Sequence, residues 1–267
     1  MMLLILIVLL ITGAYGFQSF RARQSKSKLF MKSEIKVFDD VTGVSHELCK
    51  SLAKSAMNNI ETKGTFHFSI PGGSILKMLG SGESSSLFAN IDWSKCTMGW
   101  VNHRCVPLDD ETSTEFKSSK LFLDSWKSSG LNVLSLGGST DAITEAKRMD
   151  NLVNNIEWDL MLIGVGLDGH VGSVYPDSEA VAYQGFDCIS VVKPTSSSIS
   201  FSLPTMLKSK EIIIATAGKS DKYPLGKAEG MVKALQSDDT INTFPAVAFR
   251  DKAKWFMDKD ASQLLKL

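Results

Sequence analysis

The sequence predicts an α/β domain with a mainly parallel sheet flanked by helices, Rossmann-like in its general arrangement. Residues 159–165 and 211–216 are near-continuous apolar runs, which is typical of strands buried on both faces of a parallel sheet. Segments with helical spacing of apolar residues separate such runs. No internal repeat and no linker divides residues 34–267, so we expect a single domain there.

The first predicted unit is a helix, a strand and a second helix. Ser45 can cap the first helix and Gly64 can end it. The strand covers residues 65–70, residues 71–74 form a glycine loop, and residues 75–79 begin the second helix. The apolar residues at helical spacing in the first helix are Leu48, Leu52, Ala56 and Ile60.

Further strands are expected where apolar residues cluster later in the chain. One strand ends at Trp100 and Val101, and residues 188–192 form another apolar run. The polar stretch 195–200 is expected to be an exposed connection at most. Ligands of open α/β sheets bind beyond the carboxyl ends of strands, so the loops that follow strands are the place to look for chemistry.

The first 33 residues predict a targeting sequence in two parts. Residues 1–16 begin with an apolar run too short to span a bilayer and end in small residues, which is typical of a signal peptide, although no basic residue precedes the run. Residues 17–33 carry serines and basic side chains but no acidic ones, which is typical of a transit peptide. This order resembles the presequence of secondary plastids and predicts a plastid location. Secretion with a basic linker is the alternative.

Charge and cysteine content narrow the range of partners. The 29 basic and 29 acidic residues of the chain balance, and removal of residues 1–33 leaves 24 against 29, a net charge of −5. No basic face indicates nucleic-acid binding, so we expect a small-molecule partner and no membrane association of the mature form. The four cysteines show neither a CxxC pair nor zinc spacing and are expected to be free, mostly buried thiols.

The stretch DLMLIGVGLDGHVGSVYP, residues 159–176, allows three interpretations. Residues 164–169 match the G-x-G-x-x-G dinucleotide fingerprint. That fingerprint requires a full helix and then an acidic residue after the next strand. Here Pro176 leaves room for only a short helix, and Asp187 precedes the next apolar run instead of following it. The dinucleotide interpretation is therefore a minor one.

The second interpretation is a hairpin turn at Asp168 and Gly169, but residues 170–173 do not supply the alternating strand that a hairpin needs. The third is a tight loop that holds His170 beside Asp168 at the carboxyl end of a strand. A histidine held next to a carboxylate is suited to act as a general base, whereas Asp168 can also be a turn former only.

Five ordered blocks of residues 34–267 resemble the 6-phosphogluconolactonase family. The related glucosamine-6-phosphate deaminases share the glycine loop and the D-G-H core but continue with an F-N-E-P type sequence. Residues 173–176 of this chain, SVYP, favour the lactonases. The five blocks are IPGGS, RCVPLDDETST, GVGLDGHVGSVYPDS, SFSLPTMLKSKEIIIATAGKSDK and FPAVAF.

The resemblance implies hydrolysis of 6-phosphoglucono-1,5-lactone in the oxidative pentose phosphate pathway, a reaction that requires no metal and no redox cofactor. His170 would take a proton from the attacking water and later protonate the leaving ring oxygen, and Asp168 would orient it. Glycine loops at helix N-termini and cationic side chains bind phosphate. The residues that fit this role are Gly72, Gly73, Ser74, Arg104 and Lys222.

Four positions depart from the family pattern. Asn102 and His103 precede Arg104, where the family usually has Asp-Glu. Ser198 stands where an arginine is frequent, and Val171 where a small polar residue follows the histidine. The alternative hypothesis is therefore a diverged, non-catalytic sugar-phosphate-binding protein of the same fold.

Overall fold

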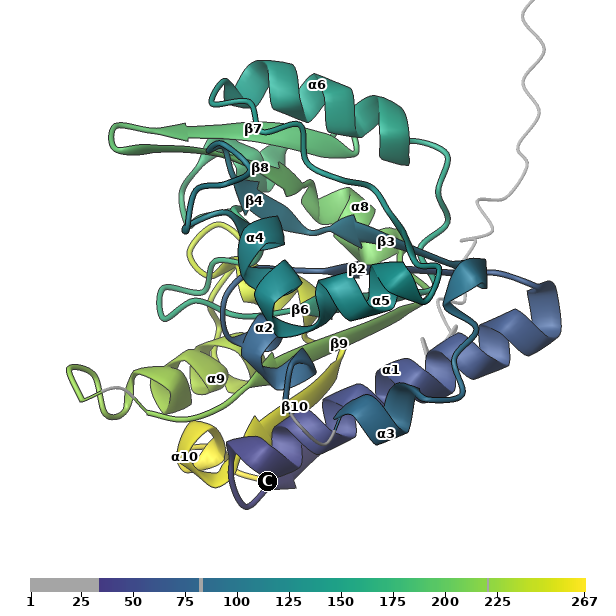
Figure 1. The fold of residues 1–267 in the computed structure, drawn as a ribbon. Helices are drawn as coiled ribbons and strands as arrows, with labels where there is room; N and C mark the ends of the chain where they lie inside the picture. Colours follow the sequence, from purple (N-terminus) through teal and green to yellow (C-terminus); the bar gives the residue numbers. More distant parts are fainter. Residues whose placement is uncertain (1–33, 82–83, 220) are drawn as a thin grey trace, which may run out of the picture. The chain divides into compact units, whose positions relative to one another are not determined.

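Parallel strands form the centre of the computed structural model, which describes residues 34–81, 84–219 and 221–267 (Figure 1). The presequence predicted for residues 1–33 lies outside the described residues. The strands of the seven-stranded sheet are β1 (Ile35–Phe38), β2 (Phe66–Ile70), β3 (Cys96–Trp100), β5 (Asn132–Val133), β6 (Leu160–Ile163), β9 (Glu211–Thr216) and β10 (Lys254–Asp258).

Every strand pair in this sheet is parallel, in the order β1-β10-β9-β6-β2-β3-β5. The predicted mainly parallel α/β fold is therefore confirmed. All four residues of β6 are 0% exposed, because this central strand is covered on both faces. The chain adds β3 and β5 on one side of β2, and then β6, β9 and β10 on the other, so the order reverses between β2 and β6.

Helices connect the strands and cover the sheet (Figure 1). They are α1 (Val41–Lys63), α2 (Ser74–Leu79), α3 (Ser84–Phe88), α4 (Thr114–Ser118), α5 (Asp124–Ser128), α6 (Ala142–Val153), α7 (Glu179–Ala182), α8 (Leu203–Lys208), α9 (Gly226–Gln236) and α10 (Lys259–Ser262). None of the helices in the described part of the chain is long and apolar enough to cross a membrane.

The predicted start of the first helix is wrong, whereas its predicted end is confirmed. Asp40 caps α1, since its carboxylate accepts hydrogen bonds from the backbone N–H groups of the second and third helical residues. Ser45 lies inside the helix and donates to the Val41 carbonyl oxygen at 2.7 Å. Gly64 ends α1 with φ of 84°, a left-handed conformation that glycine adopts readily.

A second, three-stranded sheet was not expected. It is antiparallel and consists of β4 (Asn102–Arg104), β8 (Ser196–Phe201) and β7 (Cys188–Lys193). The interpretation of residues 195–200 as an exposed connection is therefore wrong. Residues 194–195 form a two-residue turn between β7 and β8, and Ile199 and Phe201 alternate into the core although serines surround them. Helix α6 packs against β7 (Figure 1).

The predicted state of the cysteines is confirmed. All four are free and buried, and burial raises the pKa of the Cys96 and Cys105 thiols to about 12. Such thiols stay protonated at neutral pH and behave as small apolar side chains.

Candidate active site

The candidate site residues lie in the segments that follow four adjacent strands of the parallel sheet. Gly72, Gly73 and Ser74 follow β2, and Arg104 belongs to β4, which comes directly after β3. His170 and Asp168 follow β6, and Lys222 follows β9. Because parallel strands end at the same edge, the fold brings these loops to one side of the sheet. The loops after β2 and β6 flank the point where the strand order reverses, which is the usual ligand-binding position of such sheets.

The loop after β6 is tight and held by its own backbone. The Gly166 N–H donates to the His170 carbonyl oxygen at 2.9 Å, and the Gly169 N–H donates to the Gly166 carbonyl oxygen at 3.0 Å. Val171 forms single antiparallel bridges with Val165 and Val174, so the pairing never extends to the two strands of a hairpin.

A dinucleotide-binding helix is also absent from this described loop. The next helix, α7, has four residues and begins only at Glu179. The structure thus agrees with the tight-loop interpretation of residues 164–170.

His170 and Asp168 form a hydrogen-bonded pair in this loop. The distance between His170 Nδ1 and Asp168 Oδ1 is 2.6 Å. The hydrogen bond from His170 lowers the pKa of Asp168 to about 2, although partial burial raises it. An ionised carboxylate only accepts hydrogen bonds, so Nδ1 must carry the proton. The pair therefore leaves Nε2 as the basic nitrogen of the neutral ring.

Tyr175 supports the His170 ring from the side. The two ring centroids are 4.7 Å apart, with an angle of 37° between the planes. Lys193 Nζ of β7 lies 2.8 Å from the centroid of the Tyr175 ring. The antiparallel sheet thus contacts His170 through Lys193 and Tyr175. The sequence did not indicate this contact, because residues 188–192 were interpreted only as an apolar run.

A pocket of about 880 Å³ brings His170 and Asp168 together with Lys222. The rest of its lining comes from Leu167 and from the segment that leads into α9 and the first turns of that helix, with Gly226 at the helix start. The amino end of a helix attracts anions because its first N–H groups have no partner within the helix. Lys222, Lys233 and the start of α9 therefore supply positive charge to the pocket, and Glu229 in the first turn of α9 adds one carboxylate to the same lining.

Asn102 links the glycine loop to the His170 loop. Its side-chain oxygen accepts a hydrogen bond from the Gly72 N–H at 3.3 Å, and its amide nitrogen donates to Ser173 Oγ at 3.5 Å. Ser173 N–H in turn donates to Ser200 Oγ of β8 at 3.0 Å. Asn102, which departs from the family pattern, thus bridges the two loops that flank the point where the strand order reverses.

Arg104, Gly72, Gly73 and Ser74 do not line the pocket that contains His170. The Arg104 side chain is exposed, and in the antiparallel sheet its backbone pairs with Ser198. The glycine loop meets the middle block of the sequence at Gly72, where an added Cβ would lie 3.4 Å from Thr114 Oγ1. These residues lie at the same edge of the sheet, and the pocket itself contains His170, Asp168 and Lys222.

Lys227 was missed by the sequence analysis. Its Nζ donates to the Val165 carbonyl oxygen at 2.7 Å and so connects the start of α9 to the end of β6. Burial lowers the pKa of Lys227, and the nearby charge of Asp168 raises it. Among the described residues, no group of three or more His, Cys, Asp and Glu side chains is placed to hold a metal ion.

His103, the second departure from the family pattern, points into the core. It is 1% exposed, and neither ring nitrogen has a hydrogen-bond partner within the described part of the chain. Burial lowers the pKa of His103 to about 4, although the charges of Glu145 and Glu115 raise it. The folded chain therefore keeps this imidazole neutral under mildly acidic conditions.

We expect His103 to make the stability of the protein depend on pH. Between pH ~6.5 and about 4 the unfolded chain binds a proton at this residue and the folded chain does not. The contribution to stability is complete above pH ~6.5 and decreases as the pH falls toward 4, by up to about 3 kcal/mol. Urea unfolding between pH 7.5 and 5 should show this loss, and His103→Gln should reduce it. Equal pH dependence in both proteins would contradict the prediction.

The fold and the site together define an α/β protein whose polar loops gather at the carboxyl edge of a parallel sheet. Comparison of the sequence with known protein families identifies the family of this chain. The model of the glucosamine-6-phosphate isomerases/6-phosphogluconolactonase family matches residues 39–257, so the chain belongs to this family. The family expected from the five sequence blocks is confirmed.

Three similar proteins illustrate the relationship. The chain is 27% identical to 6-phosphogluconolactonase 3, chloroplastic, of Arabidopsis thaliana over 252 residues, 88% of this chain and 76% of the relative. A crystal structure of a 6-phosphogluconolactonase from Shewanella baltica OS155 matches with a TM-score of 0.73 and 22% identity, over 86% of this chain and 99% of that one. A monomeric glucosamine-6-phosphate deaminase matches with a TM-score of 0.71 and 18% identity, over 87% and 100%. The fold is thus common to both activities.

Proposed function

We propose that this chain hydrolyses 6-phosphoglucono-1,5-lactone to 6-phosphogluconate, a step of the oxidative pentose phosphate pathway. The observation that supports it best is the His170–Asp168 pair, 2.6 Å apart, in one pocket with Lys222. The SVYP sequence after His170 and the names of the curated relatives favour the lactonase over the deaminase.

In the proposed mechanism, His170 Nε2 takes a proton from a water molecule as the water oxygen bonds to C1 of the lactone. The carbonyl becomes a tetrahedral oxyanion. The bond between C1 and the ring oxygen then breaks, and the imidazolium returns the proton to that oxygen. Asp168 keeps the proton on Nδ1 and stabilises the imidazolium, so the same nitrogen serves first as base and then as acid.

The phosphate group is assigned to the cationic loops of the same edge. Lys222 and the amino end of α9 line the pocket. The glycine loop after β2 and Arg104 at the end of β4 lie outside this lining, at the same edge of the sheet, and the Gly72 N–H already donates to Asn102. A phosphate dianion accepts hydrogen bonds from several such donors at once. This arrangement would fix the far end of the substrate while His170 acts on C1.

We expect Lys222→Ala and Arg104→Ala to weaken binding more than turnover. Loss of one charge-assisted hydrogen bond costs ~1.5 to 3 kcal/mol, so KM for the phosphorylated lactone should rise by roughly 10- to 100-fold. Hydrolysis of unphosphorylated glucono-1,5-lactone should not change in Lys222→Ala. Steady-state kinetics on both substrates measure this, and equal losses on both would remove Lys222 from phosphate binding.

A direct assay tests the proposed function. Protein that begins at residue 34 is mixed with 6-phosphogluconolactone, and the loss of lactone is compared with the spontaneous rate. A rate above the background supports the lactonase. Binding of 6-phosphogluconate without any excess rate would instead support the non-catalytic sugar-phosphate-binding protein.

We also propose that residues 1–16 and 17–33 act as a signal peptide and a transit peptide for a plastid. The name of the Arabidopsis relative includes the word chloroplastic, which supports a plastid location. A fluorescent protein fused to residues 1–40 should accumulate in plastids. Its appearance in the medium or the cytosol would contradict the proposal.

A further inference from the structure

A second pocket lies at the opposite edge of the sheet, at the amino ends of the strands. It has a volume of about 680 Å³, and its lining does not include any of the site residues named above. Glu34, Asp159, Glu211 and Lys254 stand at or just before the first residues of β1, β6, β9 and β10. Helix α1 forms the other wall. We call this pocket the α1 groove.

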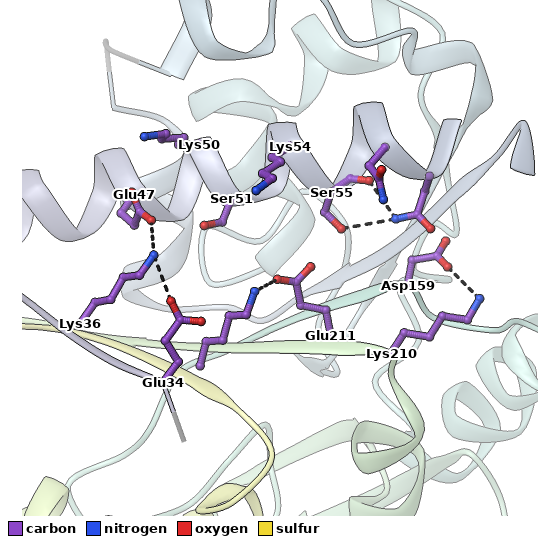
Figure 2. A pocket seen from close by; sticks show the side chains of 13 residues that line it. Glu34, Lys36, Glu47, Lys50, Ser51, Lys54, Ser55, Asp159, Lys210 and Glu211 are labelled. Atoms are coloured by element: carbon purple, nitrogen blue, oxygen red, sulfur yellow. Dashed lines mark hydrogen bonds and ion pairs between the residues drawn. The ribbon is translucent and has the colours of Figure 1, made fainter. Parts of the chain in front are cut away.

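Polar side chains of α1 face the groove over several turns. Residues 47, 50, 51, 54, 55, 58 and 59 line it, a spacing of three and four residues that corresponds to one face of a helix. Figure 2 shows Ser51 and Lys54 pointing from α1 toward the strand side of the groove. The α1 groove is therefore walled by a polar helix face on one side and charged strand ends on the other.

Every carboxylate in the groove already has a lysine partner (Figure 2). Lys36 Nζ binds Glu47 at 2.7 Å and Glu34 at 3.2 Å. Lys254 Nζ lies 2.7 Å from Glu211, and Lys210 Nζ lies 3.2 Å from Asp159. Lys63, the last residue of α1, also pairs with Asp159 at 2.7 Å, so each negative charge of the lining is balanced by a lysine of the strands, of the segment before β9 or of the end of α1.

Lys50 and Lys54 are the two lysines of the groove lining that are not paired with one of its carboxylates. In the part of the chain that the structure describes, neither forms an ion pair, and both side chains are exposed. They stand four residues apart on α1, where like charges repel each other and destabilise a helix. Glu47, one turn before Lys50, is engaged with Lys36 and does not relieve this repulsion. A bound anion near both ammonium groups would relieve this repulsion.

We propose that the α1 groove is a second binding site, for a phosphorylated polyhydroxy metabolite. Lys50 and Lys54 would bind the phosphate dianion as two point charges. The groove is larger than a phosphate group needs and lies within the size range of small-molecule sites. The hydroxyl group of Ser51 and the amide of Asn58 offer hydrogen bonds to the hydroxyl groups of the carrier, whereas the Asn59 amide nitrogen already donates to the Ser55 carbonyl oxygen at 2.8 Å.

The test is an NMR titration of the protein with glucose 6-phosphate at constant ionic strength. Backbone amide signals of residues 50–59 report on the α1 groove, and those of residues 166–170 report separately on the candidate active site. We expect saturable shifts at residues 50–59, and a Kd at least tenfold higher in the double variant Lys50→Ala with Lys54→Ala. Both side chains are exposed and alanine favours helix, so this variant should fold.

A matched control removes the same charge elsewhere. The double variant Lys147→Ala with Lys208→Ala changes two exposed lysines on α6 and α8, outside the groove, and should keep the wild-type Kd at residues 50–59. Absence of shifts at these residues, an unchanged Kd in the Lys50 and Lys54 variant, or an equal response to free glucose would each overturn the proposal. Because the signals of the two sites are separate, these results do not depend on the lactonase activity.

Discussion

Replacement of His170 by alanine should lower kcat for 6-phosphogluconolactone by about 10²- to 10⁴-fold. The variant loses the only nitrogen in our mechanism that accepts the proton of water and returns it to the ring oxygen. Binding of 6-phosphogluconate should remain nearly unchanged, because the phosphate contacts come from other loops. Turnover measured above the spontaneous rate, together with calorimetric product binding, tests both expectations.

Asp168→Asn serves as the companion variant. The amide keeps the shape of the side chain but loses the charge that holds the proton on Nδ1 and stabilises the imidazolium. We expect a smaller loss of kcat than in His170→Ala. Near-native turnover in His170→Ala would reduce this histidine to a structural residue of the loop and leave the mechanism without a base.

The parts of the fold that the sequence predicted correctly are those with local signals. The apolar run 211–216 corresponds to β9, and Gly64 ends α1, because burial on both faces and a left-handed cap each require particular residue types. Strand β8 lacked such a signal. Its serines were read as solvent-exposed, and the pairing that makes it a strand involves β4, which lies far away in the sequence.

The candidate site shows the same division. The loop of Asp168 and His170 could be located because it follows a buried strand and its glycines exclude a helix. The support of His170 by Tyr175 and Lys193, and the link from Asn102 to Ser173, depend on how loops and the antiparallel sheet pack in space. No spacing in the chain encodes such contacts. The sequence therefore predicted the candidate base His170 and its partner Asp168, but not the contacts of Tyr175, Lys193 and Asn102 around them.

Two glycines of the His170 loop provide a sharp test of this positioning. A Cβ added at Gly166 would overlap the His170 ring at Nδ1 and lie 2.6 Å from Asp168 Oδ1. A Cβ added at Gly164 would have nothing within 4 Å. Neither residue has a positive φ, so alanine causes no backbone strain at either position. The two substitutions differ only in whether they disturb the His170–Asp168 pair.

We expect Gly166→Ala to lower kcat by about 10²-fold, because a displacement of the order of 1 Å is enough for such a loss. His170 and Asp168 are partly exposed and can turn away from the new methyl group, so thermal stability should change little. As the pair separates, the pKa of Asp168 should rise from about 2 toward its ordinary value of ~3.9, which NMR titration measures. Gly164→Ala should leave kcat and this pKa unchanged. If both variants keep wild-type turnover, the hydrogen bond between Asp168 and His170 is not required for catalysis, and the orienting role of Asp168 is wrong. The role of His170 as the base is tested separately by His170→Ala.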